Sequence, residues 1–134
     1  MIGVLIVTHG SIGESLLSSA GQILGGVPPL VATLGVSRND DPDDISLRAG
    51  ELLEGLDQGD GVLVLTDIFG ATPGNAISRL LADGHIEGVS GLSLPMLLRV
   101  LTGRNSSLPG AVKRALSGGA EGLVHMNTDR CSDA

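Results

Sequence analysis

Short apolar runs of the length of a buried strand alternate along this chain with longer stretches of helical periodicity. The first run covers residues 2–7 and is rich in Ile and Val, which is typical of a strand buried on both faces. Apolar residues then recur at helical spacing over residues 12–24, and Gly25 and Gly26 are expected to end that helix. Strands that alternate with helices favour a parallel sheet with a layer of helices on each face.

The strand and helix unit recurs further along the chain without a sequence repeat. We therefore predict an α/β fold, an open three-layer sandwich with a mainly parallel central sheet of about four parallel strands. Residues 1–126 are expected to form one domain and residues 127–134 a flexible tail. The remaining strands are expected at 30–36, 61–66, 89–92 and, more weakly, 122–125, and the remaining helices from the acidic stretch 39–44 to Leu56 and at 73–82, 95–101 and 109–116.

Two of the expected helix starts carry capping signals. Ser11 and Glu14 have the spacing of a capping box, in which each side chain satisfies a free amide of the first turn. The acidic stretch 39–44 contains Pro42, which suits the first helical position, and its carboxylates complement the positive helix end. We interpret this charge run as a solvated face.

Composition and charge exclude several classes of function. The 134 residues are 42% hydrophobic with Phe69 as the only aromatic residue, so the core must be aliphatic. Fifteen acidic residues against eight basic ones give a net charge of −7, which disfavours nucleic acid as a partner. Cys131 is the only cysteine, which rules out an internal disulfide and a cysteine metal cluster.

The sequence also predicts a cytoplasmic protein. The N-terminus lacks the basic start and the long apolar stretch of a signal peptide. No run approaches the roughly 18 apolar residues of a membrane span.

Polar residues that can take part in catalysis follow the first and third expected strands. Ligands of open α/β folds bind beyond the carboxyl ends of the strands, and both His9 and Asp67 fall there. An acid that ends an apolar strand needs a partner, and a histidine fits. A carboxylate bonded to one ring nitrogen orients the imidazole and leaves the other nitrogen free to attack. We interpret His85 and His125 as structural or surface residues.

The loop after the third strand has the features of an anion site. Thr72 followed by Pro73 is typical of an N-cap and a first helical position. Free amides at such a helix start, together with the helix dipole, can hold a phosphate. Gly10, next to His9, allows a tight turn or a close approach to a ligand.

With these motifs the chain resembles the IIA component of the mannose family (EIIA) of the bacterial phosphoenolpyruvate-dependent sugar phosphotransferase system. The resemblance runs from Ile2 to about Val124 and rests on three segments in order, namely VTHG at 7–10, TDIFGATPGNA at 66–76 and GLSLPML at 91–97. It implies that His9 is phosphorylated on Nε2 and that Asp67 bonds its other ring nitrogen. It further implies that Thr72 and its neighbours hold the phosphoryl group. We expect the phosphate-binding residues to be Thr72, Gly10, Gly70 and Ala71.

The resemblance also implies partners. The chain would be a phosphotransferase that receives its phosphoryl group from phospho-HPr without a metal or cofactor. Its acceptor would be a separate IIB-type protein or a regulated protein, with membrane contact only through a permease complex. A homodimer is implied, in which residues of about 120–126 form an antiparallel edge strand on the partner's sheet. We expect Phe69 at the rim that contacts these partners.

This sequence departs from the family pattern at two positions. Ala71 stands where the family usually has Gly, and Ser93 where it usually has Asn.

Other phosphoryl-transfer proteins fit less well. A histidine phosphatase needs an Arg directly before its histidine, where this chain has Thr8. A receiver domain needs an acidic pair after the first strand and a Lys near the last strand, and neither is present. The phosphocarrier subunit of dihydroxyacetone kinase shares the expected fold and histidine, so it stays open as an alternative. A non-catalytic interaction module would have no need of His9, Asp67 and Thr72 together.

Overall fold

Strands and helices alternate as predicted. The computed structural model describes residues 1–68 and 72–129, with residues 72–74 and 129 described by their backbone alone. The strands are β1 (Gly3–His9), β2 (Val31–Val36), β3 (Val62–Thr66) and β4 (Ile86–Ser90). The helices are α1 (Ile12–Leu24), α2 (Pro42–Leu56), α3 (Thr72–Ser78), α4 (Leu94–Leu101), α5 (Leu108–Glu121) and α6 (Met126–Asp129).

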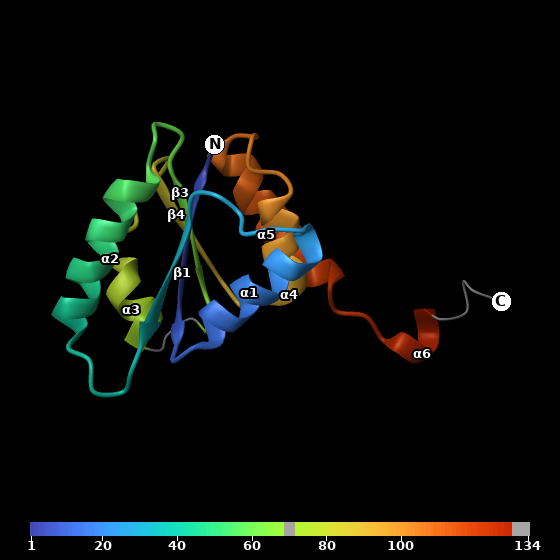
Figure 1. Cartoon of the computed structure of the whole chain (residues 1–134), viewed down its shortest axis with the longest axis horizontal. Helices are drawn as coiled ribbons and strands as arrows, with labels where there is room; N and C mark the ends of the chain where they lie inside the picture. The colour runs from blue at the N-terminus through green and yellow to red at the C-terminus, as the bar shows by residue number, and fades with distance from the viewer. Residues whose placement is uncertain (69–71, 130–134) are drawn as a thin grey trace.

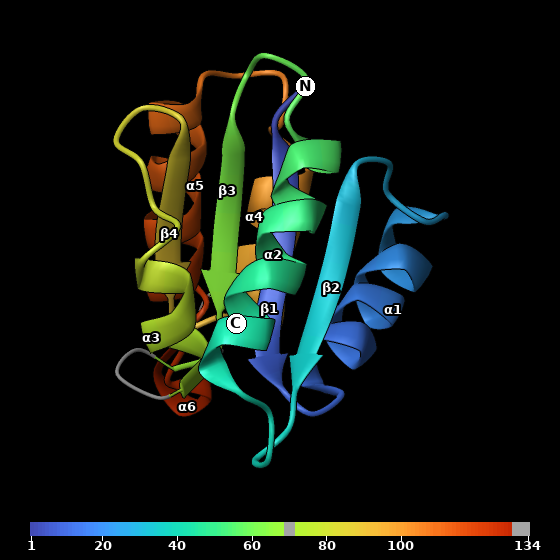
Figure 2. The ribbon, with the colours of Figure 1, turned by 90° about the vertical axis from the view of Figure 1, so that its left-hand side faces the viewer.

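The four strands form one parallel sheet in the order β2-β1-β3-β4 (Figure 2). Helices α2 and α3 cover one face, and α1, α4 and α5 cover the other (Figure 1). This arrangement confirms the predicted three-layer α/β sandwich. The chain passes from β1 to β2 on one side and then returns to place β3 on the other side of β1. The strand order therefore reverses between β1 and β3.

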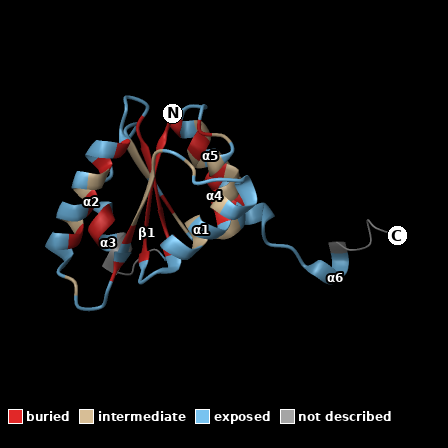
Figure 3. Cartoon of the chain, viewed as in Figure 1, coloured by how far each residue is buried: buried red, intermediate tan, exposed pale blue. Residues whose placement is uncertain are grey.

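The core lies on both faces of β1 and β3 (Figure 3). Ile6 and Leu65 point into the cluster beneath α1, α4 and α5, whereas Leu5 and Val64 point into the cluster beneath α2 and α3. Both clusters consist of aliphatic residues and Met96. Burial on both faces explains why these strands read as continuous apolar runs rather than as alternating patterns.

Helix α1 begins where expected, but the predicted capping box is wrong. Ser11 is the N-cap residue and makes no side-chain capping bond, because its φ of −99° and ψ of 12° depart from the extended backbone of a usual N-cap. The buried hydroxyl of Thr8 instead accepts a hydrogen bond from the Gly13 N–H at 2.8 Å. The end of β1 thus caps the helix that follows it.

The predicted start of α2 is confirmed. Asp41 is the N-cap residue, and its carboxylate accepts a hydrogen bond from the Asp43 N–H at 2.9 Å. Pro42 occupies the first helical position, where its missing N–H costs nothing. The Asp43 side chain is 84% exposed, in agreement with a solvated face.

Some predicted boundaries are wrong. Helix α3 ends at Ser78 rather than at residue 82, and β4 begins at Ile86 rather than at residue 89. The cause is a tight connection in which the Ala82 N–H donates to the Ile86 carbonyl at 2.9 Å and the Ile86 N–H donates back at 2.8 Å. None of the described helices reaches the length and apolarity of a membrane span.

The C-terminal strand predicted at 122–125 is absent from the described part of this single chain. Helix α5 continues to Glu121, residues 123–125 have no regular structure, and α6 follows within the predicted tail. The segment leads away from the body of the molecule (Figure 1), so the chain's own sheet offers it no neighbouring strand with which to pair. Residues 130–134, which include Cys131, lie outside the described residues.

We expect Gly13→Ala to lower the free energy of unfolding by about 1–3 kcal/mol. A Cβ at Gly13 would lie 2.7 Å from Cγ2 of Ile6, which is fully buried and stiff because it is β-branched. Urea unfolding followed by circular dichroism measures the change. Gly50→Ala is the matched control, because Gly50 lies inside α2 with no atom within 4 Å of an added Cβ. Equal effects of the two substitutions would contradict close packing of α1 on β1.

Candidate active site

The candidate site lies at the carboxyl ends of β1 and β3, at the point where the strand order reverses. The two strands are parallel neighbours, with Val7 paired to Thr66. Helix α1 leaves the end of β1 toward one face of the sheet, and α3 follows β3 on the other face (Figure 1). Ligands of open α/β folds bind at such points. His9 ends β1 and Asp67 directly follows β3, so both predicted residues lie here.

The side chains of His9 and Asp67 are hydrogen-bonded, as the sequence predicts. The Nδ1 atom of His9 lies 2.9 Å from Oδ2 of Asp67. The same oxygen accepts the His9 backbone N–H at 3.0 Å, and Oδ1 accepts the Ile68 N–H at 3.0 Å. The Asp67 side chain is 14% exposed, whereas the imidazole of His9 is 48% exposed. The carboxylate is thus enclosed and fixed, and the ring that it orients is open to solvent.

The charge state of Asp67 sets the tautomer of His9. Burial by itself raises the pKa of this carboxyl, but hydrogen bonds from the backbone N–H and ring of His9 and from the Ile68 N–H outweigh it and lower the pKa below 3.8. An ionised carboxylate only accepts hydrogen bonds, so Nδ1 of His9 carries the proton of the shared bond. In the neutral ring the Nε2 atom then has a free lone pair, which is the requirement for a nucleophile.

Gly10, directly after β1, packs tightly against β2. Its φ is +51°, a conformation that favours glycine, and its N–H donates to the Val36 carbonyl at 2.9 Å. Gly35 on β2 lies directly against the Gly10 carbonyl and has no room for a side chain. The amide of Gly10 is therefore already engaged and is not a free donor, while no atom lies within 4 Å of the place where a Cβ would stand.

The loop between β3 and α3 is the predicted phosphate loop. Gly70, Ala71 and the predicted contact residue Phe69 lie outside the described residues. Helix α3 begins at Thr72, one residue before the expected first helical position. Because α3 follows the end of β3, it begins at the same end of the sheet as His9 and Asp67.

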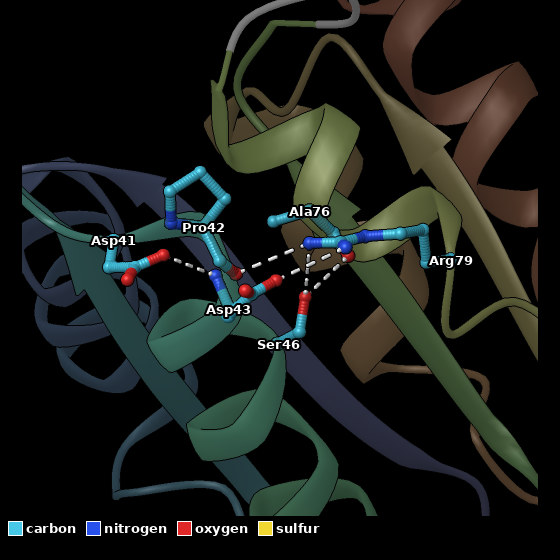
Figure 4. A network of polar contacts seen from close by, with 6 residues as sticks. All are labelled: Asp41, Pro42, Asp43, Ser46, Ala76 and Arg79. Carbon is cyan, nitrogen blue, oxygen red and sulfur yellow. Dashed lines mark hydrogen bonds and ion pairs between the residues drawn. The ribbon is translucent and has the colours of Figure 1, made fainter.

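A polar network fixes α3 against the start of α2 (Figure 4). Arg79 donates from Nη2 to the Ser46 hydroxyl at 3.0 Å and to the Pro42 carbonyl at 3.4 Å, and its Nη1 pairs with Asp43 at 3.4 Å. The Ser46 hydroxyl in turn donates to the Ala76 carbonyl at 3.2 Å. The helix that follows the predicted phosphate loop is thereby attached to a neighbouring element, a role that the sequence analysis missed.

Ser93 helps to fix the loop after β4, which lies beside the end of β3. It is the N-cap residue of α4, and its hydroxyl accepts the Met96 N–H at 3.3 Å. Just before it, the Leu92 N–H donates to the Thr66 carbonyl at 2.9 Å and so ties this loop to the end of β3. Asn and Ser are both favoured N-cap residues, which gives a physical reason why Ser can stand where Asn is usual.

The other two histidines lie on the surface, as predicted. His85 is exposed and precedes β4, and its carbonyl accepts the N–H of Val62 at the start of β3, at the far end of the sheet from His9. His125 is exposed in the segment after α5, where its Nδ1 lies 2.8 Å from the Thr128 hydroxyl. Neither residue contacts His9 or Asp67 in the described hydrogen bonds.

Known proteins are similar to this chain in sequence. A family model described as the fructose IIA component of the PTS, the phosphotransferase system (EIIA-man), matches residues 3–116. The mannose-specific EIIAB component of Escherichia coli strain K12 is 33% identical over 125 residues, which cover 91% of this chain but only 38% of that protein. The fructose-specific EIIA component of Bacillus subtilis strain 168 is 33% identical over 103 residues, which cover 76% of this chain and 70% of that protein.

A solved structure agrees with these relatives. The phosphotransferase system component EIIA from Streptococcus agalactiae superimposes with a TM-score of 0.84 at 28% identity, covering 96% of this chain and 99% of that one. The family model spans most of the chain, and the Bacillus relative is matched over more than two thirds of its length. The chain therefore belongs to the mannose and fructose family of EIIA components of the phosphotransferase system.

Proposed function

We propose that this EIIA component is a phosphocarrier, in which Nε2 of His9 takes a phosphoryl group from phospho-HPr. The group then passes to a separate IIB-type protein or serves as a regulatory signal that other proteins detect. The observation that carries the proposal is the 2.9 Å contact between His9 Nδ1 and Asp67 Oδ2. Membership of a phosphotransferase system family supports it.

The contact between His9 and Asp67 suits transfer chemistry. The lone pair of Nε2 forms a bond to phosphorus while the bond between phosphorus and the donor breaks, and the proton on Nδ1 stays in place. Positive charge that develops on the imidazole faces an ionised carboxylate already fixed by two backbone N–H donors. Release to the acceptor is the same step in reverse, so neither metal nor redox cofactor is needed for the balance.

The phosphoryl group itself would be held by the start of α3. Thr72 and the amides of Gly70 and Ala71 are the proposed donors, and Gly10 leaves space for the group beside the histidine. An anion at this place benefits from the positive N-terminal ends of helices.

Exposed apolar residues beside the histidine favour a protein as the donor. Ile12 in the first turn of α1 is 47% exposed, and Ile68 next to Asp67 is 55% exposed. Apolar side chains around a reactive group are typical of a surface that another protein covers during transfer. Phe69 is proposed to belong to the same rim. The mannose-specific and fructose-specific relatives favour a sugar-system acceptor over dihydroxyacetone kinase.

We expect His9→Ala to abolish phosphorylation, because it removes the only proposed nucleophile. The protein is incubated with phosphoenolpyruvate, the general phosphotransferase enzyme and HPr, and acid-labile phosphate is mapped by mass spectrometry. His85→Ala is the matched control, since this exposed histidine lies at the far end of the sheet from His9, and it should be labelled like the wild type. Label that persists in His9→Ala would end the assignment.

We expect Asp67→Asn to slow transfer by roughly 10-fold to 100-fold, the cost of weakening a charge-assisted hydrogen bond. Rapid mixing with phospho-HPr measures the single-turnover rate. Asp83→Asn is the matched control, because Asp83 is exposed in the connection before β4. Equal rates for the two variants would show that the carboxylate does not orient the ring.

The pH dependence of stability gives an independent check of the same carboxylate. Because the pKa of Asp67 is lowered in the folded state, its ionised form stabilises the protein above the unfolded value of 3.8. That contribution is lost as the pH falls through the folded-state pKa. The difference in unfolding free energy between wild type and Asp67→Asn should therefore shrink below pH 3.8.

We also propose a homodimer that covers the C-terminal segment. Leu123, Val124 and Met126 are 85%, 53% and 76% exposed, and no strand in the described part of the chain pairs with the outer side of β4. An apolar extended segment and an open sheet edge are both features that proteins usually cover. A partner's segment centred on residues 123–125, within the expected range of 120–126, would cover both if it lay against this edge as an antiparallel strand.

We expect the double substitution Leu123→Glu and Val124→Glu to yield a monomer, because two carboxylates cannot be buried at such an interface without loss of binding energy. Sedimentation equilibrium gives the mass in solution. Leu47→Glu is the control, since Leu47 is also exposed, at 63%, but lies on α2. A monomeric wild type, or a dimer that the double substitution leaves intact, would contradict the proposal.

A further inference from the structure

A cavity of about 600 Å³ lies at the opposite end of β1 from His9. It is bounded by Met1, by the connection between α1 and β2 and by the connection between α4 and α5. Among the residues that the structure describes, its charged side chains are those of Arg104 and Arg114, and its lining includes neither Asp nor Glu. In a chain with fifteen acidic and eight basic residues, a cavity lined by two cations and no acid is unexpected.

Arg104 is a buried cation, 5% exposed, whose hydrogen-bonding capacity is only partly used. Its Nη1 donates to the carbonyls of Leu30 at 3.2 Å and Ile2 at 3.4 Å. Its Nε is buried without a partner among the described residues. No carboxylate faces the guanidinium in its described ion pairs and hydrogen bonds, and burial lowers its pKa, as expected for a cation removed from water.

Arg114 is held in place on the other side of the cavity lining. Its Nε donates to the Arg99 carbonyl at 3.0 Å, and its Nη2 donates to the Thr102 hydroxyl at 3.4 Å. The side chain lies directly over Gly103, where a Cβ would overlap the guanidinium. Both arginines are therefore positioned by neutral oxygens, which leaves their positive charge uncompensated by an acid.

A purely structural role explains only part of this arrangement. The bonds from Arg104 Nη1 staple the start of β1 to the residue before β2, and they account for one nitrogen of the guanidinium. They do not account for Nε, and a buried donor without a partner is unfavourable. The edge of a guanidinium formed by Nε and Nη2 is the fork that binds carboxylate and phosphate oxygens in pairs.

We propose that this cavity binds a small organic anion through a phosphate or carboxylate group. Two anion oxygens take the Nε and Nη2 donors of Arg104, and Arg114 adds a second positive charge. Because Nε is buried, the anion meets Nη2 first and reaches Nε by a small rotation of the guanidinium. The apolar part of the ligand lies against Leu24, Val27 and Pro28, which also line the cavity. This site is separate from His9 and does not depend on phosphoryl transfer.

Titration of the ¹⁵N-labelled full chain, followed by NMR at constant ionic strength, tests the proposal. The probes are phenyl phosphate, benzoate and the uncharged phenol. We expect saturable shifts of the amides of Gly25, Gly103 and Asn105 with at least one anion and none with phenol. The comparison of the two anions identifies the preferred headgroup.

Substitutions decide whether the arginines are responsible. Arg114→Gln should weaken binding at the cavity roughly tenfold, the effect of losing one charge-assisted contact. Lys113→Gln is the matched control, because it removes the same charge from the adjacent position of α5 and does not line the cavity, and it should leave the dissociation constant unchanged. Arg104→Met should abolish binding, and if that variant does not fold, Arg114→Gln decides alone.

Three results would overturn the proposal. The first is shifts confined to His9 and Asp67, which would place the anion at the transfer site. The second is the absence of saturable shifts with either anion. The third is equal affinity in the Arg114→Gln and Lys113→Gln variants.

Discussion

The hydrogen bond between His9 and Asp67 depends on the placement of β1 directly beside β3. The two residues are separated by 58 positions in the chain and meet only because parallel pairing brings both strand ends to one edge. Thr8, the residue before His9 in β1, contributes to the same geometry. Its buried hydroxyl binds the first turn of α1, so that the strand passes into the helix with the imidazole on the outer side. The site is thus a consequence of register and capping as much as of its two polar residues.

Much of this could be predicted from the sequence because the informative signals are local. Apolar runs mark β1 and β3, and polar residues at their ends are conspicuous for that reason. The pairing of His9 with Asp67 needed one further step, namely that an acid at the end of a buried strand requires a partner. The capping box at Ser11 failed because spacing alone does not reveal the backbone angles of Ser11, nor that Thr8, on the preceding strand, binds the Gly13 amide.

The features that sequence reasoning missed depend on distant contacts. Arg79 contacts residues of α2 more than 30 positions away, and Arg104 contacts a carbonyl 102 positions away. A single arginine carries no periodicity or spacing that would indicate such a role. The C-terminal strand does not form within the single chain for a related reason, because a short apolar segment becomes a strand only where a neighbouring strand is available. Within one chain, residues 123–125 have none.

The parallel α/β arrangement gives the two ends of the sheet opposite electrostatic character. Helices α1 and α3 begin at the carboxyl ends of the strands, where their positive ends favour a phosphoryl group beside His9. Helices α1 and α4 end at the other side, where unpaired carbonyls favour cations. Arg114 meets this demand by binding the Arg99 carbonyl in the last turn of α4. Arg104 binds the carbonyl of Ile2, just before β1, and the carbonyl of Leu30, just before β2. Once carbonyls hold both guanidiniums, their remaining donors lie beside a cavity whose described lining has no acid. The same arrangement of strands and helices thus underlies the proposed phosphoryl site at His9 and the proposed anion site at the far end.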